Sequence, residues 1–174
     1  MTKTTIPPEQ LSAEVQALCN VLNDSPDVAC VVVSAAFLNS AMRMLLDKSF
    51  VRSEKVNSLL NSPTALRSYA VRNDLLYSLG VIDDWLHSDL ETLGKIRNEV
   101  AHSHIELSFG EPKISDLCSE LLGWKQVFPS KEDREPSPAP DSKQFLTVAR
   151  NKFILSVLLV ANRLIMRGLS LQRE

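Results

Sequence analysis

Three residues in one short segment have side chains that could do chemistry together: Arg97, Asn98 and His102. A histidine titrates near neutral pH and can accept or donate a proton. An arginine stays charged and binds phosphate oxygens with two parallel N–H donors. A base that deprotonates a 2′-hydroxyl, beside a cation that stabilises the developing phosphate charge, could cleave RNA without a metal. The segment therefore indicates phosphate or RNA chemistry as one hypothesis.

The same residues also have a purely structural explanation. On a helical wheel with Leu93 at zero, Arg97 falls at about 40°, Asn98 at about 140° and His102 at about 180°. Arg97 thus lies at the margin of the apolar stripe, where its charge needs an acceptor. We expect it to be partly buried and paired with a carboxylate, from Asp89 or from an acid of the neighbouring helix, or with a bound anion. His102 would be a helix-terminal cation stabilised by the helix dipole. We favour this structural explanation over catalysis.

Other groupings of reactive side chains give weaker signals. His87 and His104 could be combined with nearby aspartates into a metal site, but no His-x3-His or paired-cysteine motif supports it. No glycine-rich loop could hold a phosphate. The sequence therefore predicts neither a metal nor a cofactor. Arg72 is expected to form a fold-fixing bridge with Asp89 across the turn at Gly80.

The three cysteines are expected to be reduced, buried thiols. Cys19, Cys30 and Cys118 lie among apolar residues, their number is odd and none belongs to a CxxC pair. Such cysteines are typical of a cytosolic protein. We therefore predict a cytoplasmic location.

Spacing of apolar residues predicts the elements that position these side chains. After a first helix set up by Pro7-Pro8, Ser25-Pro26 should start a second helix over about 26–51, whose nearly all-apolar segment 28–38 is expected to be the most buried stretch. Gly80 should end one helix and Asp83 or Asp84 begin the next. The remaining expectations are a short helix or turn over 53–61, helices over 62–80, 84–103 and 114–124, a mobile loop over 126–142 and a closing helix over 143–174.

Composition limits the class of protein. The 174 residues fit one domain, residues 1–174, and only 5 are glycine, few for a β-rich protein. The fold class predicted is all-α, a single bundle of six to seven helices. The net charge of −2 does not support a generally basic nucleic-acid-binding surface. The apolar runs 28–38 and 153–161 fall short of the ~20 residues of a membrane span, so we expect core helices and no membrane.

Residues 75–109 resemble the mannitol operon repressor family of bacterial regulators. The resemblance rests on two features: Arg72 followed by Leu75-Leu76-Tyr77-x-Leu79-Gly80-Val81-Ile82, and the run Lys95-Ile96-Arg97-Asn98-x-x-Ala101-His102. It extends over about residues 28–121. The resemblance implies an all-helical bundle, commonly paired into a dimer, in a family named for transcriptional control.

The arginine–polar–x3–histidine pattern of residues 97–102 also resembles HEPN domains, many of which are metal-independent ribonucleases or toxin components that act as dimers. Three hypotheses follow. The first, which we favour, is a non-enzymatic regulator that acts as a homodimer through a protein partner. The second is a HEPN-type ribonuclease or toxin–antitoxin component that uses Arg97, Asn98 and His102 on RNA. The third is a DNA-binding repressor, which we place last because the helix after Gly80 begins with Asp83-Asp84, and a phosphate backbone would repel these acids.

Overall fold

The structure, a computed structural model, describes residues 12–62, 66, 68–102, 108–127 and 142–171. All regular secondary structure in these residues is helical. The helices are α1 (Ala13–Asp24), α2 (Asp27–Ser49), α3 (Glu54–Asn61), α4 (Tyr69–Ser78), α5 (Asp84–His102), α6 (Pro112–Glu120), α7 (Gly123–Val127) and α8 (Ser142–Ser170). The predicted all-helical bundle is confirmed.

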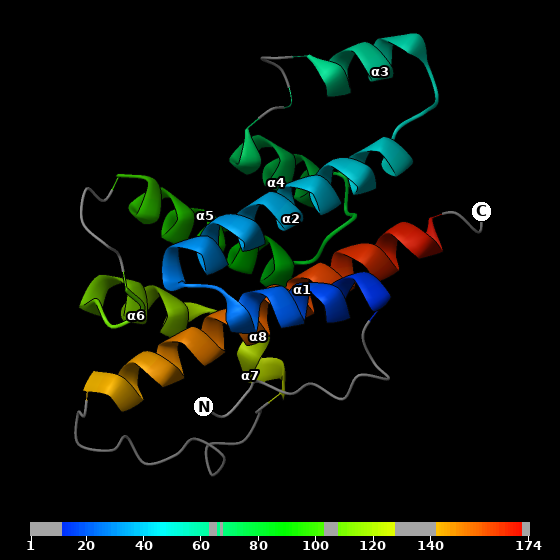
Figure 1. Cartoon of the computed structure of the whole chain (residues 1–174). Coiled ribbons are helices and arrows are strands. Elements are labelled where there is room, and N and C mark those ends of the chain that lie inside the picture. Colours follow the sequence, from blue (N-terminus) through cyan, green and yellow to red (C-terminus); the bar gives the residue numbers. More distant parts are fainter. Residues whose placement is uncertain (1–11, 63–65, 67, 103–107, 128–141, 172–174) are drawn as a thin grey trace.

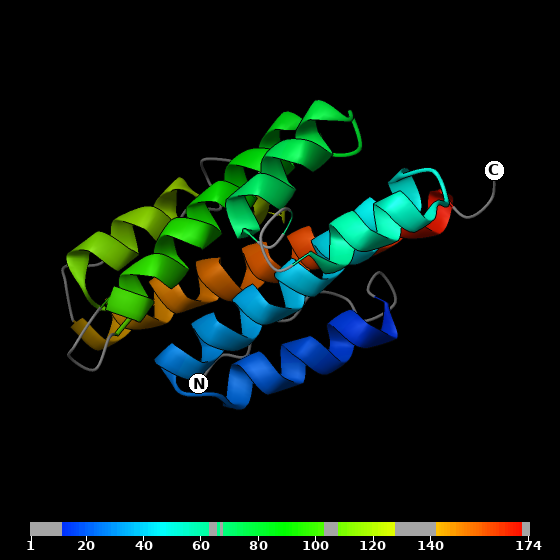
Figure 2. The ribbon, with the colours of Figure 1, turned by 90° about the horizontal axis from the view of Figure 1, so that it is seen from above.

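The helices form three layers (Figure 2). The middle layer is made by α2 and α8, which run side by side along the molecule in both views (Figures 1 and 2). α1 covers one side of this layer, and α4, α5 and α6 cover the other. The short α7 also packs on α8, whereas α3 contacts the bundle mainly through α2. Consequently α5, which carries the predicted site, is held in an outer layer.

The centre of the core is in α8. Every side chain from Phe153 to Leu158 is buried, because α8 is surrounded by α1, α2, α5, α6 and α7. The prediction that residues 28–38 would be the most buried was wrong: Val32 is 51% exposed and Val28 is 38% exposed. The helices around α2 leave one of its faces uncovered. Apolar residues on every side of a helix therefore do not require that every side is buried.

Local signals set most helix ends. Gly80 has a φ of +67°, and the Val81 amide donates to the carbonyl of Leu76 at 3.0 Å, so the glycine ends α4 as predicted. The carboxylate of Asp83 accepts from the Leu86 amide at 3.4 Å and thereby caps α5. At the first helix, Ser12 is the capping residue. Pro7-Pro8 lies outside the described residues.

Two boundaries differ from the sequence expectation. The predicted 62–80 helix is described only as Tyr69–Ser78, and the 114–124 helix is two helices, α6 and α7, separated by Leu121-Leu122. The break occurs where the carboxylate of Asp89 accepts the Leu122 and Gly123 amides and starts α7. Most of the expected 126–142 loop lies outside the described residues. The closing helix runs from Ser142 to Ser170, close to its predicted bounds.

The apolar runs 28–38 and 153–161 are parts of the long helices α2 and α8, as the sequence predicted. Asp27–Ser49 and Val148–Ser170 are each long and apolar enough to cross a membrane by length and composition. This is weak evidence for a membrane span, because the core helix of a soluble protein passes the same test. In the α8 window, 56% of the residues are buried inside the bundle, as core packing requires.

Candidate functional site

Arg97 and Asn98 lie on the surface at the C-terminal end of α5. Both are exposed, and the Arg97 Nη1 donates to the Asn98 Oδ1 at 3.0 Å. His102, the last residue of α5, is also exposed. In the described part of the chain no carboxylate pairs with Arg97, so the predicted partly buried ion pair with Asp89 was wrong.

Arg97 is exposed because the neighbouring helix α4 begins too late in the sequence to cover it. Tyr69, the first residue of α4, packs its ring on Gly94, with the ring carbon Cε1 3.2 Å from where a Cβ would stand. The last two turns of α5 therefore extend beyond the described start of α4 and lose that cover. The apolar stripe itself remains covered here, since Ile96 is 0% exposed, but Arg97 at its margin is exposed.

Asp89 is used elsewhere. This carboxylate is 1% exposed and accepts from the amides of Leu122 at 2.6 Å and Gly123 at 2.7 Å. Burial raises the pKa of Asp89, while the two backbone donors lower it. Gly123 is required because a Cβ there would be 2.9 Å from the Asp89 Oδ2. Asp89 is thus a structural residue that joins α5 to α7.

Arg72 is buried and also structural. Its guanidinium donates to the Oδ1 of Asn39 on α2 at 2.7 Å and to the carbonyl of Leu66 at 2.5 Å. The predicted bridge to Asp89 was therefore wrong. Arg72 faces α2, whereas Asp89 faces α7 and α8. The arginine joins α4 to the middle layer of the bundle.

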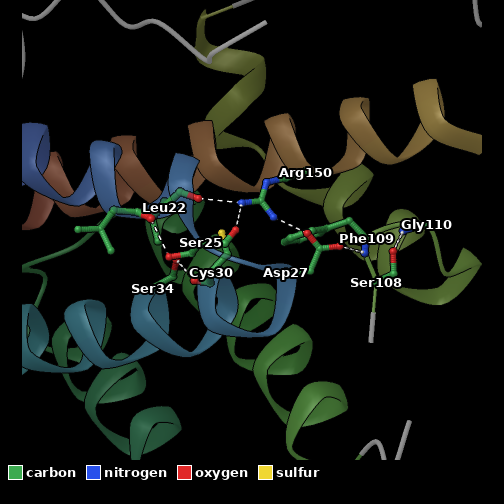
Figure 3. A network of polar contacts seen from close by, with 10 residues as sticks. Leu22, Ser25, Asp27, Cys30, Ser34, Ser108, Phe109, Gly110 and Arg150 are labelled. Atoms are coloured by element: carbon green, nitrogen blue, oxygen red, sulfur yellow. Dashed lines mark hydrogen bonds and ion pairs between the residues drawn. The ribbon is translucent and has the colours of Figure 1, made fainter. Parts of the chain in front are cut away.

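A network that sequence reasoning missed is centred on Arg150 of α8 (Figure 3). Its guanidinium is paired with Asp27 and donates to the carbonyls of Leu22 and Ser25 at the end of α1. The Asp27 carboxylate also accepts from the Phe109 amide at 3.0 Å. The cation satisfies helix-terminal carbonyls and the acid lies at a helix N-terminus, both favourable positions. No short-range pattern could reveal it, because Asp27 and Arg150 are far apart in the sequence.

The cysteines match their prediction. All three are free thiols, with Cys30 and Cys118 buried and Cys19 half-buried. Burial raises the pKa of Cys30 and of Cys118 to about 12. Within the described residues no group of three His, Cys, Asp or Glu side chains could hold a metal ion.

The outer surface of the α4–α5 helical hairpin carries the other cluster of polar side chains. His87 Nε2 lies 2.9 Å from the Asp74 Oδ1, and the Tyr77 hydroxyl donates to the Asp84 Oδ1 at 2.9 Å. The rings of Tyr77 and His87 are 4.6 Å apart. The hydrogen bond to Asp84 raises the pKa of Tyr77. These groups are at the surface, unlike Asp89, Arg72 and Arg150.

Taken together, the buried charged groups fix helices to one another, and the chemically active groups that remain available lie on the outer layer. This arrangement defines an all-helical bundle whose candidate functional residues lie on its surface. The chain belongs to the mannitol repressor family, whose family model matches residues 15–170. No curated protein matches the chain.

Two solved structures share the fold. One is the X-ray structure of the MtlR–HPr complex from Escherichia coli, with 22% sequence identity, 88% of this chain and 99% of that chain covered, and a TM-score of 0.70. The other is a possible transcriptional regulator, YggD, from Shigella flexneri 2a str. 2457T, with 16% identity, the same coverage and a TM-score of 0.74. At these identities the likeness establishes the fold.

Proposed function

We propose that this chain is a non-enzymatic, cytoplasmic regulator that acts by binding a protein partner. Its membership of the mannitol repressor family supports regulation, and the fold it shares with a chain crystallised in an MtlR–HPr complex supports a protein partner. The observation that carries the proposal is the use of the buried charged residues. Asp89, Arg72 and Arg150 are committed to holding helices together, which leaves surfaces for recognition.

The test is a calorimetric titration of the purified protein with HPr from the same organism. Saturable binding, absent with an unrelated protein of similar size and charge, is the expected result. Absence of binding to HPr, and of any change in target-operon expression when the gene is deleted, would overturn the proposal.

Self-association is part of the proposal. The apolar side chains of α8 do not offer an interface, because Phe153 and Leu158 are buried in the core. Support comes instead from the uncovered face of α2, where Val28, Val32 and Met44 are 38–51% exposed. A two-fold dimer is the commonest closed assembly and would cover such a face.

A second candidate function is metal-independent RNA cleavage by Arg97, Asn98 and His102. The observation in its favour is that the Arg97 guanidinium is exposed, with the amide oxygen of Asn98 beside it, so a phosphate could reach it. The test is an RNA-cleavage assay with chelator present. Cleavage by the wild type that is lost in Arg97→Ala and in His102→Ala would favour this candidate over the first.

A further inference from the structure

We infer that the outer face of the α4–α5 hairpin is the docking surface for a protein partner whose contact surface is apolar at its centre and rich in lysine and arginine at its rim. This hairpin face consists of Val71, Asp74, Tyr77, Asp84 and His87. The inference rests on the proposed function, because it names the place and the chemistry of the protein partner.

The centre of the hairpin face is apolar. Val71 is 41% exposed and Tyr77 43%, and both lie on α4. The spacing places Val71, Asp74 and Tyr77 on one side of α4, while Arg72, Asn73 and Leu76 point inward. Exposed apolar side chains that include a tyrosine and are surrounded by polar groups are typical of protein-binding surfaces.

The aromatic side chain at this centre is already held in place. Tyr77 is fixed by its hydrogen bond to Asp84 and by the ring of His87, and His87 is in turn held by Asp74. Both contacts join α4 to α5. A side chain ordered before binding loses less conformational entropy on binding, which favours its use as an anchor.

The rim of the hairpin face is acidic. Among the described residues, neither Asp74, Asp83 nor Asp84 has a lysine or arginine within ion-pair distance. Glu91, further along α5, is already paired with Lys95 at 3.0 Å. The unmatched negative charge favours a partner that brings lysines or arginines to this rim.

The same charge argues against a second copy of this chain as the occupant. A two-fold contact through the hairpin face would bring Asp74 and Asp84 of one copy toward the same acids of the other. Like charges placed together across an interface are unfavourable. The occupant is therefore a different protein.

The experiment compares binding of HPr, the probe of the proposed function, to matched charge-reversal variants. The test variant is Asp74→Lys/Asp84→Lys. The control is Glu14→Lys/Asp116→Lys, which makes the same charge change at exposed acids of α1 and α6, with Glu14 also in the first turn of its helix. A third variant, Val71→Ser, removes apolar surface of this face without changing charge. Circular dichroism melts establish that each variant is folded, and Asp74→Asn/Asp84→Asn replaces the reversal if it unfolds.

We expect the test variant to weaken binding about tenfold or more, as loss of two exposed ion pairs to repulsion implies, and the control to change it by less than about twofold. Val71→Ser should weaken binding as well. Raising the salt from about 0.05 M to about 0.5 M should weaken binding by the wild type, because its ion pairs are screened, and should strengthen binding by the test variant, because its repulsion is screened.

Three outcomes would count against the docking surface. Equal affinity of wild type and test variant would overturn it while leaving the proposed function intact. A change in sedimentation of the test variant, with HPr binding unaltered, would assign the face to self-association instead. Failure of the wild type to bind HPr would overturn the proposed function and the docking surface together.

Discussion

At the scale of single residues, burial decides whether a substitution changes the stability of the fold. Asp89, Arg72 and Arg150 have partners on other helices, whereas Arg97, Asn98 and His102 extend from the surface at the end of α5. Loss of a buried partner leaves an unpaired polar group in the core. Loss of an exposed side chain leaves no buried group without a hydrogen-bond partner. The stability of the fold should therefore depend on the first group of residues and not on the second.

Arg97→Ala and His102→Ala should each change the free energy of unfolding by less than about 0.5 kcal/mol, because both side chains are exposed. Urea denaturation followed by circular dichroism measures this change. A loss near the roughly 3 kcal/mol expected for breaking a buried ion pair would show that Arg97 has a structural partner after all.

The two buried thiols should be unreactive in the native protein. With a pKa of about 12, Cys30 and Cys118 carry almost no thiolate at pH 8, and their sulfurs are covered. A disulfide-exchange reagent should therefore modify at most Cys19 until the protein unfolds. Mass spectrometry of the modified peptides identifies the cysteines that reacted. Rapid labelling of Cys118 in the native state would contradict the structure.

How far the sequence determines a residue's role depends on how local that role is. The turn at Gly80 and the cap at Asp83 were predictable, because the hydrogen bonds that form them join residues only a few positions apart. Asp89 was not, since its two amide donors lie on Leu122 and Gly123, beyond another helix. The exposure of Arg97 was missed because it depends on where α4 begins.

At the scale of helices, one arginine on α8 connects three of them. Arg150 takes up the last carbonyls of α1 and pairs with the first residue of α2, and its guanidinium lies 5.7 Å from the centre of the Phe109 ring. The Arg150 guanidinium, the ends of α1 and α2 and the Phe109 ring thus lie together at the point where α1 joins the middle layer.

Arg150→Met should lower the free energy of unfolding by about 2 kcal/mol or more, because Asp27 and two carbonyls lose a partly buried partner. Arg163→Met is the matched control on the same helix, at an exposed position, and should have an effect below about 0.5 kcal/mol. Chemical denaturation of both variants measures the difference. Equal stability of the two would show that the network contributes nothing.

Helix existence was predictable from apolar spacing, but the order of burial among helices was not. Both α2 and α8 are strongly apolar, yet α8 is enclosed and α2 is not. The difference arises from how many neighbours each helix has, which depends on the arrangement of the whole chain and on no property of its own residues.

At the scale of the whole molecule, the uncovered apolar face of α2 predicts self-association. Sedimentation at micromolar concentration should give a species larger than the 19.4 kDa monomer. Val32→Glu, at a position 51% exposed, should shift the equilibrium toward the monomer because it places a charge in the contact.

The control for this prediction is Leu59→Glu on α3, at a comparable exposed apolar position, which should leave sedimentation unchanged. A monomer for the wild type at all concentrations would refute the dimer. An equal effect of both substitutions would mean that α2 is not the contact.

The central position of α8 has a consequence for biosynthesis. It is the last helix described, and it packs against α1, α2, α5, α6 and α7, all of which leave the ribosome earlier. Until α8 is synthesised, the inward faces of those helices lack the helix on which they pack. The carboxylate of Asp27 also lacks its ion-pair partner, Arg150. We therefore expect the cooperative folding transition only once α8 has been added, and we expect the uncovered inward faces to favour aggregation before that point.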